Sequence, residues 1–312
     1  MDVDTRLLRY FAVVAEEGNI TRAAERLFMA QPSLTKQIKQ LETTLGVQLF
    51  VRSRAGMALT GPGRALADRV PALLDALHEA VRETTAAASR SEQILRVGIM
   101  GSGANEATPA IIAAFGERRP GWRVELRQGV WSEPTAGLAD GGVDAALLYL
   151  PFPGQERWRV TELFTEPRCV LLPSGHRLAD RASIAFRELR DEPFVAAPPE
   201  AGEWRDWWLA TDAREGSPPR IGTETRHPDD WLNAIANGYG IALAPSAAAR
   251  YYPRPGIIQR PLTGVAPCTV AVVRSPAADA NPAVEAFVDS CLTVVGSRLP
   301  LRSVSPIPHW RS

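Results

Sequence analysis

One stretch near the beginning of the chain carries polar side chains at a spacing that suits hydrogen bonding to a grooved surface. Between residues 31 and 45, Leu34, Ile38 and Leu41 recur at i, i+4 and i+7, which indicates one buried helix face. The opposite face carries side chains that can all donate hydrogen bonds: Gln31, Ser33, Thr35, Lys36, Lys39 and Gln40. Glutamine, threonine and lysine can address base edges, so the spacing predicts a helix that contacts DNA in the major groove.

Positive charge is concentrated around this predicted helix, although the whole chain is neutral, with 35 basic and 35 acidic residues. From Ile20 to Arg64, seven basic residues face two acidic ones, and Lys36 and Lys39 are the only lysines in the chain. The residues expected to contact phosphates lie at helix ends and in a basic turn: Thr21, Arg22, Arg52 and Arg54. Such local charge suits a polyanion, although an ordinary solvated surface would also carry it.

The elements that must hold this helix are also visible in the sequence. A first helix over 7–14 is expected to end at Gly18, and Thr21 is the expected N-cap of a short bracing helix. Pro32 suits the first turn of the DNA-contacting helix, where its missing N–H has no intrahelical partner, and Gly46 closes that helix. This arrangement is a helix-turn-helix.

A wing and a long helix are expected to follow. Alternating residues at 47–51, a turn at 52–56 and a return at 58–60 predict two short strands. A helical segment then runs to about Ser89, with positions spaced alternately four and three apart: Leu66, Val70, Leu73, Leu77, Ala80 and Thr84. This heptad spacing predicts pairing with a second helix, and Pro71 should kink the segment or disrupt one turn.

From Ile94 onward, strands alternate with helices, which indicates an α/β unit with a largely parallel sheet. The expected strands lie at 95–99, 123–126, 144–150, 169–172, 194–197, 241–244 and 268–273, and the expected helices at 109–118, near Leu138 and at 283–295. The last strand and helix can return to the first group of elements. The tail after Pro300 is expected to be disordered.

A second candidate site follows the first of these strands. Gly101, Ser102 and Gly103 separate the strand from the helix expected over 109–118. Such a turn can present backbone amides and a hydroxyl at the positive end of a helix, which favours a carboxylate or similar anion. The same residues also suit an ordinary turn, so the motif alone leaves the site open.

Residues for catalysis or metal binding are not grouped in this sequence. The four histidines, His78, His176, His227 and His309, form no H-x-x-x-H pair, and no G-x-S-x-G motif occurs. Cys169, Cys268 and Cys291 form no C-x-x-C pair and are expected to be reduced thiols. We therefore expect neither an enzyme nor a metal site nor a cofactor.

The stretch from Leu7 to Gly63 resembles the DNA-binding domain of LysR-type regulators along its whole length. The resemblance rests on an aromatic first helix, on RAAERL, AQPSLTKQI and LETTLGVQLF, and on a basic wing that ends in LT. It implies that Gln31, Pro32, Thr35 and Lys36 lie at the groove and that Arg52 or Arg54 contacts DNA from the wing. Arginine is frequent in such regulators where this chain has Lys36, which should weaken bidentate recognition of guanine.

A weaker resemblance covers residues 94–290, which look like the two-lobed effector domain similar to periplasmic binding proteins. It rests on LRVG at 95–98, LADGGVDAALL at 138–148, LPSGHRLAD at 172–180 and IANGYGIALAPSAAA at 235–249. The resemblance implies a ligand between the lobes and dimers that pair into tetramers. The residues expected to face this cleft, besides Ser102 and Gly103, are Trp131, Ser132, Ala197, Pro198, Thr225 and His227.

Two of these expectations have plain alternatives. His227 is equally compatible with a solvent-exposed loop. Trp204, Trp207, Trp208 and Trp231 suit stacking on an aromatic effector, but also packing within their own lobe.

The sequence thus predicts an α/β protein with an N-terminal winged helix-turn-helix, a long linker helix and a C-terminal two-lobed, periplasmic-binding-protein-like effector domain. The expected boundaries are 1–62, 63–91 and 92–300, with a tail at 301–312. Lobe 1 comprises 92–165 and 268–300, and lobe 2 comprises 166–267. No basic and apolar leader and no apolar run of about 20 residues occurs, so the cytoplasm is the expected location. A solute-binding or enzymatic protein that uses the two lobes is the alternative.

Overall fold

The computed structural model describes residues 3–27, 29–53 and 56–298. The chain forms two compact units, one over Met1–Glu83 and the other over Thr84–Ser312. Within the described residues, no helix has both the length and the apolar character needed to cross a bilayer.

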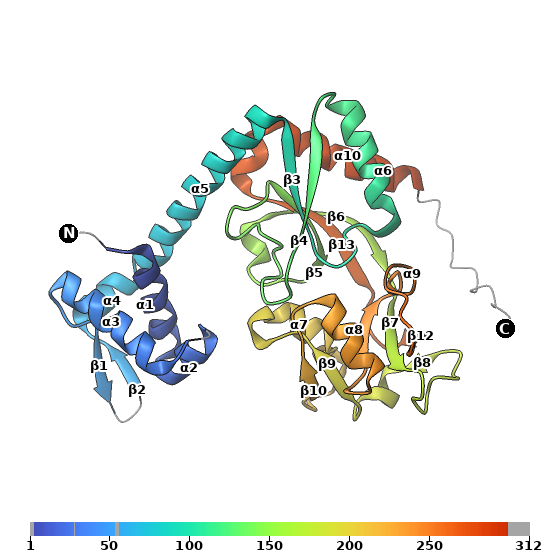
Figure 1. Ribbon diagram of the computed structural model, residues 1–312, viewed down its shortest axis with the longest axis horizontal. Helices are drawn as coiled ribbons and strands as arrows, with labels where there is room; N and C mark the ends of the chain where they lie inside the picture. Colours follow the sequence, from blue (N-terminus) through green and yellow to red (C-terminus); the bar gives the residue numbers. More distant parts are fainter. Residues whose placement is uncertain (1–2, 28, 54–55, 299–312) are drawn as a thin grey trace. The chain divides into compact units, whose positions relative to one another are not determined.

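The first unit begins with three helices packed on one apolar core (Figure 1). They are α1 (Thr5–Glu17), α2 (Ile20–Arg26) and α3 (Gln31–Leu45). The helix ends at Gly18 and Gly46 are confirmed, because both glycines adopt the left-handed conformation. The N-cap of α2 is Asn19 and not Thr21: the Asn19 side chain accepts from the amides of residues 21 and 22 at 2.9 and 3.2 Å.

The wing follows as the antiparallel pair β1 (Phe50–Ser53) and β2 (Gly56–Leu59). The segment after it is not one helix. It forms α4 (Gly61–Ala67) and α5 (Val70–Glu92), which are separated at residues 68 and 69. Pro71 lies in the first turn of α5, where the absence of its N–H is tolerated. The expected disruption near Pro71 is confirmed.

The second unit contains two lobes, one built on a five-stranded sheet and the other on a four-stranded sheet and a separate strand pair (Figure 1). Lobe 1 has the strand order β4-β3-β5-β13-β6. Its strands are β3 (Ile94–Ile99), β4 (Arg123–Gln128), β5 (Ala145–Leu150), β6 (Arg159–Glu166) and β13 (Cys268–Arg274). Helices α6 (Thr108–Arg118) and α10 (Pro282–Arg298) pack together against this sheet.

Lobe 2 contains a sheet of order β11-β7-β12-β8 and the separate pair β9-β10. Its strands are β7 (Arg168–Pro173), β8 (Ile184–Ala185), β9 (Pro193–Ala196), β10 (Arg220–Glu224), β11 (Ala242–Pro245) and β12 (Ile257–Thr263). Its helices are α7 (Glu203–Trp208), α8 (Pro228–Ala236) and α9 (Ala248–Tyr251). The chain passes between the lobes twice, after β6 and after β12.

Two expectations about this unit are wrong. The sheets are mixed, because β13 runs antiparallel to both β5 and β6, and β7 runs antiparallel to both β11 and β12. The helix expected near Leu138 is a series of turns. Ala136, Gly137 and Gly141 have φ values of 51°, 90° and 74°, which a right-handed helix does not accommodate.

Candidate functional site

The polar face of α3 is set by the burial of the opposite face. Leu34 and Leu41 are fully buried and Ile38 is 4% exposed, so the side chains between them point away from the core. Pro32, Ser33, Lys36, Lys39 and Gln40 are exposed, and Gln31 and Thr35 are half-buried. The Gln31 side chain donates to the Thr35 hydroxyl at 3.0 Å, and this hydroxyl donates to the Gln31 carbonyl at 2.9 Å.

The positive charges around α3 differ in their availability. Among the described residues, neither Lys36 nor Lys39 takes part in an ion pair, so both remain available to an anionic partner. Arg22 lies 3.6 Å from Glu17, and Arg26 contacts Glu17 at 3.1 Å and Glu16 at 2.8 Å. Both acids precede Ile20 in the chain and partly offset the charges of these two arginines. The two lysines have no such partner among the described residues.

The wing is fixed to the helices by backbone hydrogen bonds. The Glu42 carboxylate on α3 accepts from the amides of Leu49 and Phe50 at 2.8 and 3.2 Å. The Met57 amide on β2 donates to the Gly18 carbonyl at 2.8 Å. Arg52 belongs to β1, whereas Arg54 lies outside the described residues. Strand β1 therefore starts at a position determined by α3.

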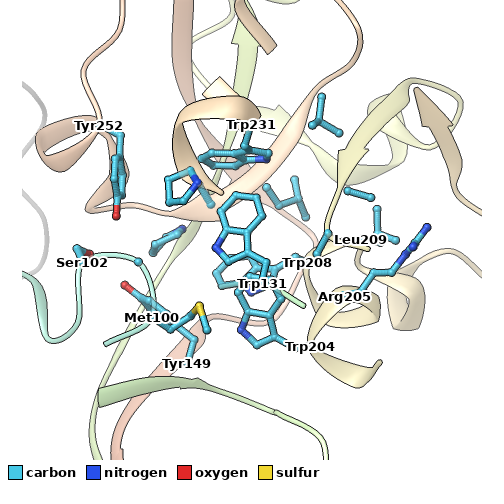
Figure 2. Close-up of a pocket in the computed structure, with 18 residues that line it drawn as sticks. Met100, Ser102, Trp131, Tyr149, Trp204, Arg205, Trp208, Leu209, Trp231 and Tyr252 are labelled. Atoms are coloured by element: carbon cyan, nitrogen blue, oxygen red, sulfur yellow. The ribbon is translucent and has the colours of Figure 1, made fainter. Parts of the chain in front are cut away.

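A second site is a cavity lined by residues of both lobes (Figure 2). Lobe 1 contributes Met100, Gly101, Ser102, Trp131 and Tyr149. The residues that lobe 2 contributes are 195–197 at the end of β9, Trp204, Arg205, Trp208 and Leu209 from the α7 region, Pro228 and Trp231 from α8, residues 243–245 of β11, and Tyr252. The cavity has a volume of about 70 Å³, which is room for more than one water molecule.

Aromatic rings form one continuous wall of this cavity. Trp131 lies 5.3 Å from Trp231 and 5.8 Å from Trp204, measured between ring centroids. Trp208 continues the wall, 6.0 Å from Trp204 and 5.7 Å from Tyr149. All four pairs are tilted or edge-to-face, so no ring covers the whole face of another. Such a wall suits a flat or apolar ligand.

Hydroxyl groups gather at the other end of the cavity. Figure 2 shows the oxygens of Ser102, Tyr149 and Tyr252 on the side away from Trp204. Burial raises the pKa of Tyr149 well above its usual value, and the nearby Glu166 charge raises it further, so Tyr149 is a neutral phenol at neutral pH. This end of the site presents neutral hydroxyl groups to the cavity, and the Tyr149 hydroxyl in turn donates to Glu166 at 3.4 Å.

The Gly-Ser-Gly turn uses most of its own amides. The Gly103 amide donates to the Met100 carbonyl at 3.2 Å, and the Ala104 amide donates to the Thr108 hydroxyl at 3.0 Å. The Gln128 side-chain amide can pair with both the N–H and the carbonyl of Gly101, each at 3.2 Å. Helix α6 starts only at Thr108. A short 3-10 helix, Asn105–Ala107, joins the turn to α6, so the turn does lie at the start of a helical segment. Its own contacts leave the Ser102 amide alone available to a ligand among these four described residues.

A buried carboxylate lies behind Ser102. The Ser102 hydroxyl donates to the Asn105 side-chain oxygen, and the Asn105 amide donates to Glu166 at 2.6 Å. The other Glu166 oxygen accepts from the Ser246 hydroxyl at 3.0 Å and from the Ala247 amide at 2.9 Å. Ser246 and Ala247 belong to lobe 2, so Glu166 links the cavity-lining turn of lobe 1 to lobe 2.

The structure brings some of the expected cleft residues to the cavity and not others. Ser102, Trp131 and Ala197 line it. The other expected residues do not line the cavity: Gly103 and Pro198 are buried elsewhere, and Ser132 and Thr225 are half-buried elsewhere. His227 is exposed at the N-cap of α8.

Sequence reasoning did not assign Met100, Tyr149 and Tyr252 to the site. Of the four tryptophans that the sequence offered for stacking on an effector, Trp204, Trp208 and Trp231 line the cavity. Trp204 and Trp208 lie four residues apart on α7, which is the spacing of one helix face. Trp207 points elsewhere, against the Arg168 guanidinium 4.3 Å from its ring centre.

Two family models match this chain. The LysR substrate binding domain matches residues 88–296, and the bacterial regulatory helix-turn-helix protein of the lysR family matches residues 5–64. The transcriptional regulator AlsR of Bacillus subtilis is 30% identical over 254 residues, which cover 80% of this chain and 83% of that protein. The Hca operon transcriptional activator HcaR of Escherichia coli is 29% identical over 287 residues, which cover 92% and 96%.

Solved structures of regulators share the fold. HinK, a LysR family transcriptional regulator from Pseudomonas aeruginosa, is 25% identical with a TM-score of 0.52, and the match covers 95% of this chain and 100% of HinK. Full-length CbnR in complex with its target DNA is 23% identical with a TM-score of 0.51, covering 94% and 100%. These relatives are regulators and not enzymes. The chain belongs to the LysR family of DNA-binding transcription regulators and joins a helix-turn-helix domain to an effector-binding domain.

Proposed function

We propose that this regulator reads its operator with the exposed face of α3 and that the cavity between the lobes binds its effector. The observation that carries the first part is the pair of unpaired, exposed lysines at 36 and 39, beside a face of hydrogen-bonding side chains. Gln31, Ser33 and Thr35 lie at the N-terminal end of α3, which is the end that approaches base edges in a helix-turn-helix. Pro32 sets the start of that helix.

We assign phosphate contacts to the surroundings of α3. Thr21 and Arg22 lie in the first turn of α2, and Arg52 and Arg54 belong to the wing region of the sequence. Arg22 must exchange its partner Glu17 for a phosphate, so its contribution is smaller than that of the lysines.

The test of the DNA part is Lys36→Ala in a gel-shift titration against an operator found by binding-site selection at fixed salt. A base contact predicts a loss of about 1–3 kcal/mol at the operator, whereas a phosphate contact predicts equal losses on all sequences. Arg181→Ala is the control, because it removes an exposed positive charge from the other unit. Operator affinity unchanged by Lys36→Ala would contradict this role of α3.

The effector part rests on the aromatic wall and on the sharing of the cavity by both lobes. The Trp131 amide of lobe 1 donates to the Arg226 carbonyl of lobe 2 at 3.1 Å, at the edge of the same cavity. A ligand that contacts both lobes can shift the equilibrium between different arrangements of the lobes. Effector binding can then affect the rest of the chain. Trp131→Ala should abolish the effect of the inducing metabolite on operator binding and leave the affinity without ligand intact.

We further propose that the chain acts in the cytoplasm as a homodimer or homotetramer, with α5 forming the dimer contact. The seam is the row of heptad positions Leu66, Val70, Leu73, Leu77, Ala80 and Thr84. Val70 is fully buried in the core of its own domain, so the part of the seam offered to a partner begins at Leu73, which is 54% exposed. Leu77 is half-buried and Ala80 is exposed. We place the domain limits at the boundaries expected from the sequence, with residues 166–267 as the second lobe.

A further inference from the structure

Two side chains that line the cavity carry hydrogen-bond donors that the described part of the protein does not satisfy. The Nε1 atoms of Trp204 and Trp208 are buried and have no partner among the described residues, and both side chains line the cavity. Trp204 is 6% exposed. Figure 2 shows its nitrogen on the ring edge that faces Met100 and Tyr149. A buried N–H without an acceptor is unfavourable, so a ligand oxygen within reach would be bound in preference to an apolar group.

Positive charge is not available to an anionic ligand in this cavity. Arg205 is the only lysine, arginine or histidine in the described lining, and its guanidinium already pairs with Glu224 at 2.7 Å. Figure 2 shows this guanidinium pointing away from Trp131 and Trp204. A carboxylate placed among the indoles would therefore lose its hydration without gaining a cation.

Charge at the hydroxyl end also disfavours an anion. Glu166 lies two hydrogen bonds behind the Ser102 hydroxyl and takes part in no ion pair among the described residues. Arg250, whose charge acts on Glu166, is itself paired with Glu106. Three of the four turn amides are occupied, as described above. Glu166 and the indole faces would attract a cation, but a cation without an acceptor atom would leave the indole N–H groups unsatisfied.

We propose that the effector is an uncharged, flat molecule with at least one hydrogen-bond-accepting oxygen, such as an aromatic ketone, ester, lactone or quinone. This inference rests on the proposed role of the cavity as the effector site. The aromatic wall binds the ring, and the N–H groups of Trp204 and Trp208 bind the oxygen. The assignment replaces the anion that the Gly-Ser-Gly turn suggested in the sequence.

Four probes of nearly the same shape test the proposal on the full-length protein by calorimetric titration at pH 7. Acetophenone is neutral and accepts a hydrogen bond, α-methylstyrene replaces its oxygen by a methylene, benzoate is the anion, and benzamidine is the cation. We expect acetophenone to bind about tenfold tighter than each of the other three, since one hydrogen bond and one uncompensated charge each have effects of this order. Equal affinity for acetophenone and α-methylstyrene, or tighter binding of benzoate or benzamidine, would overturn the proposal.

Variants that keep the ring and remove the N–H locate the oxygen. The double variant Trp204→Phe and Trp208→Phe should reduce the preference for acetophenone over α-methylstyrene from about tenfold to less than twofold. Trp207→Phe is the matched control, because Trp207 has the same unpaired Nε1 on the same helix but does not line the cavity. A preference that persists in the double variant would refute the assigned donors. The proposal can be tested even if a variant does not fold, because the four probes are also compared on the unaltered protein.

The same titrations separate this inference from the proposed function. Binding of benzoate with the highest affinity, lost in Trp131→Ala, would refute the uncharged ligand and leave the cavity as the effector site. Probe binding that Trp131→Ala leaves unchanged would remove the cavity from the function, and the present inference with it.

Discussion

The Glu42 carboxylate should stabilise the wing by about 2–4 kcal/mol, and Glu42→Ala measures this contribution. It accepts from two backbone amides, at 2.8 and 3.2 Å, in residues that are 1% and 6% exposed. Water cannot easily replace the lost acceptor at such positions, and each hydrogen bond to a charged group contributes about 1.5–3 kcal/mol. Two such bonds sum to about 3–6 kcal/mol, and we reduce this sum to about 2–4 kcal/mol because Glu42 is itself only half-buried and water can partly replace it.

Hydrogen exchange of the full-length protein reports this loss at the two amides of Leu49 and Phe50. A local loss of about 2–4 kcal/mol accelerates their exchange by roughly 30- to 700-fold, and Glu42→Gln should lose about 1 kcal/mol, because it keeps an acceptor oxygen. The control is Glu25→Ala, which removes an exposed carboxylate from α2. Exchange in Glu42→Ala that is as slow as in Glu25→Ala would refute the reasoning.

Three further predictions concern other parts of the chain. Leu73→Asp should convert oligomers into monomers in light scattering at micromolar concentration, whereas Ile221→Asp, at a 37% exposed position in lobe 2, should not; a protein that is monomeric before the change contradicts the seam. Ser102→Ala should weaken effector binding in calorimetry and leave operator affinity without effector nearly intact, and equal affinity for a confirmed effector would remove Ser102 from the site. Burial raises the pKa of Cys268 and of Cys291 to about 12, so both are neutral thiols at pH 8 and should react with a thiol reagent only after denaturation; rapid reaction of the folded protein would contradict their burial.

Periodicity in the sequence was enough to predict the helices of the first unit and most strands of the second. Burial of Leu34, Ile38 and Leu41 follows directly from their spacing, because tertiary contacts reinforce the local pattern. The N-cap of α2 was misassigned because Asn19 and Thr21 are both good capping residues. Only the backbone conformation at Asn19, with φ of −146°, decides which of them precedes the helix.

Long-range features were not predictable in this way. The direction of β13 relative to β5 depends on a connection that passes through the whole of lobe 2, and no local pattern encodes it. The Gly-Ser-Gly turn looked like an anion site because its amides were counted as free. Three of these amides have partners within the protein: the Met100 carbonyl, the Thr108 hydroxyl and the Gln128 side chain. The periodicity of the sequence does not reveal such contacts of side chains with backbone amides. The aromatic wall likewise joins Trp131 to rings that lie 73 and 100 residues further along the chain, at Trp204 and Trp231.

The position of β13 between β5 and β6 has a consequence for the synthesis of the protein. Every strand of lobe 2 precedes β13 in the chain, since β12 ends at Thr263 and β13 begins at Cys268. On the ribosome, lobe 2 can therefore complete its sheet while lobe 1 still lacks a central strand.

Until β13 emerges, β5 and β6 each expose an edge that the finished sheet covers. The missing strand contributes four consecutive residues, 270–273, that are fully buried in the folded domain. Open edges of this kind pair readily with other chains. Nascent chains that stall between residues 166 and 268 should therefore be the ones that recruit chaperones. Because the chain crosses between the lobes twice, both lobes can line one cavity, but the folding of lobe 1 is delayed until late in translation.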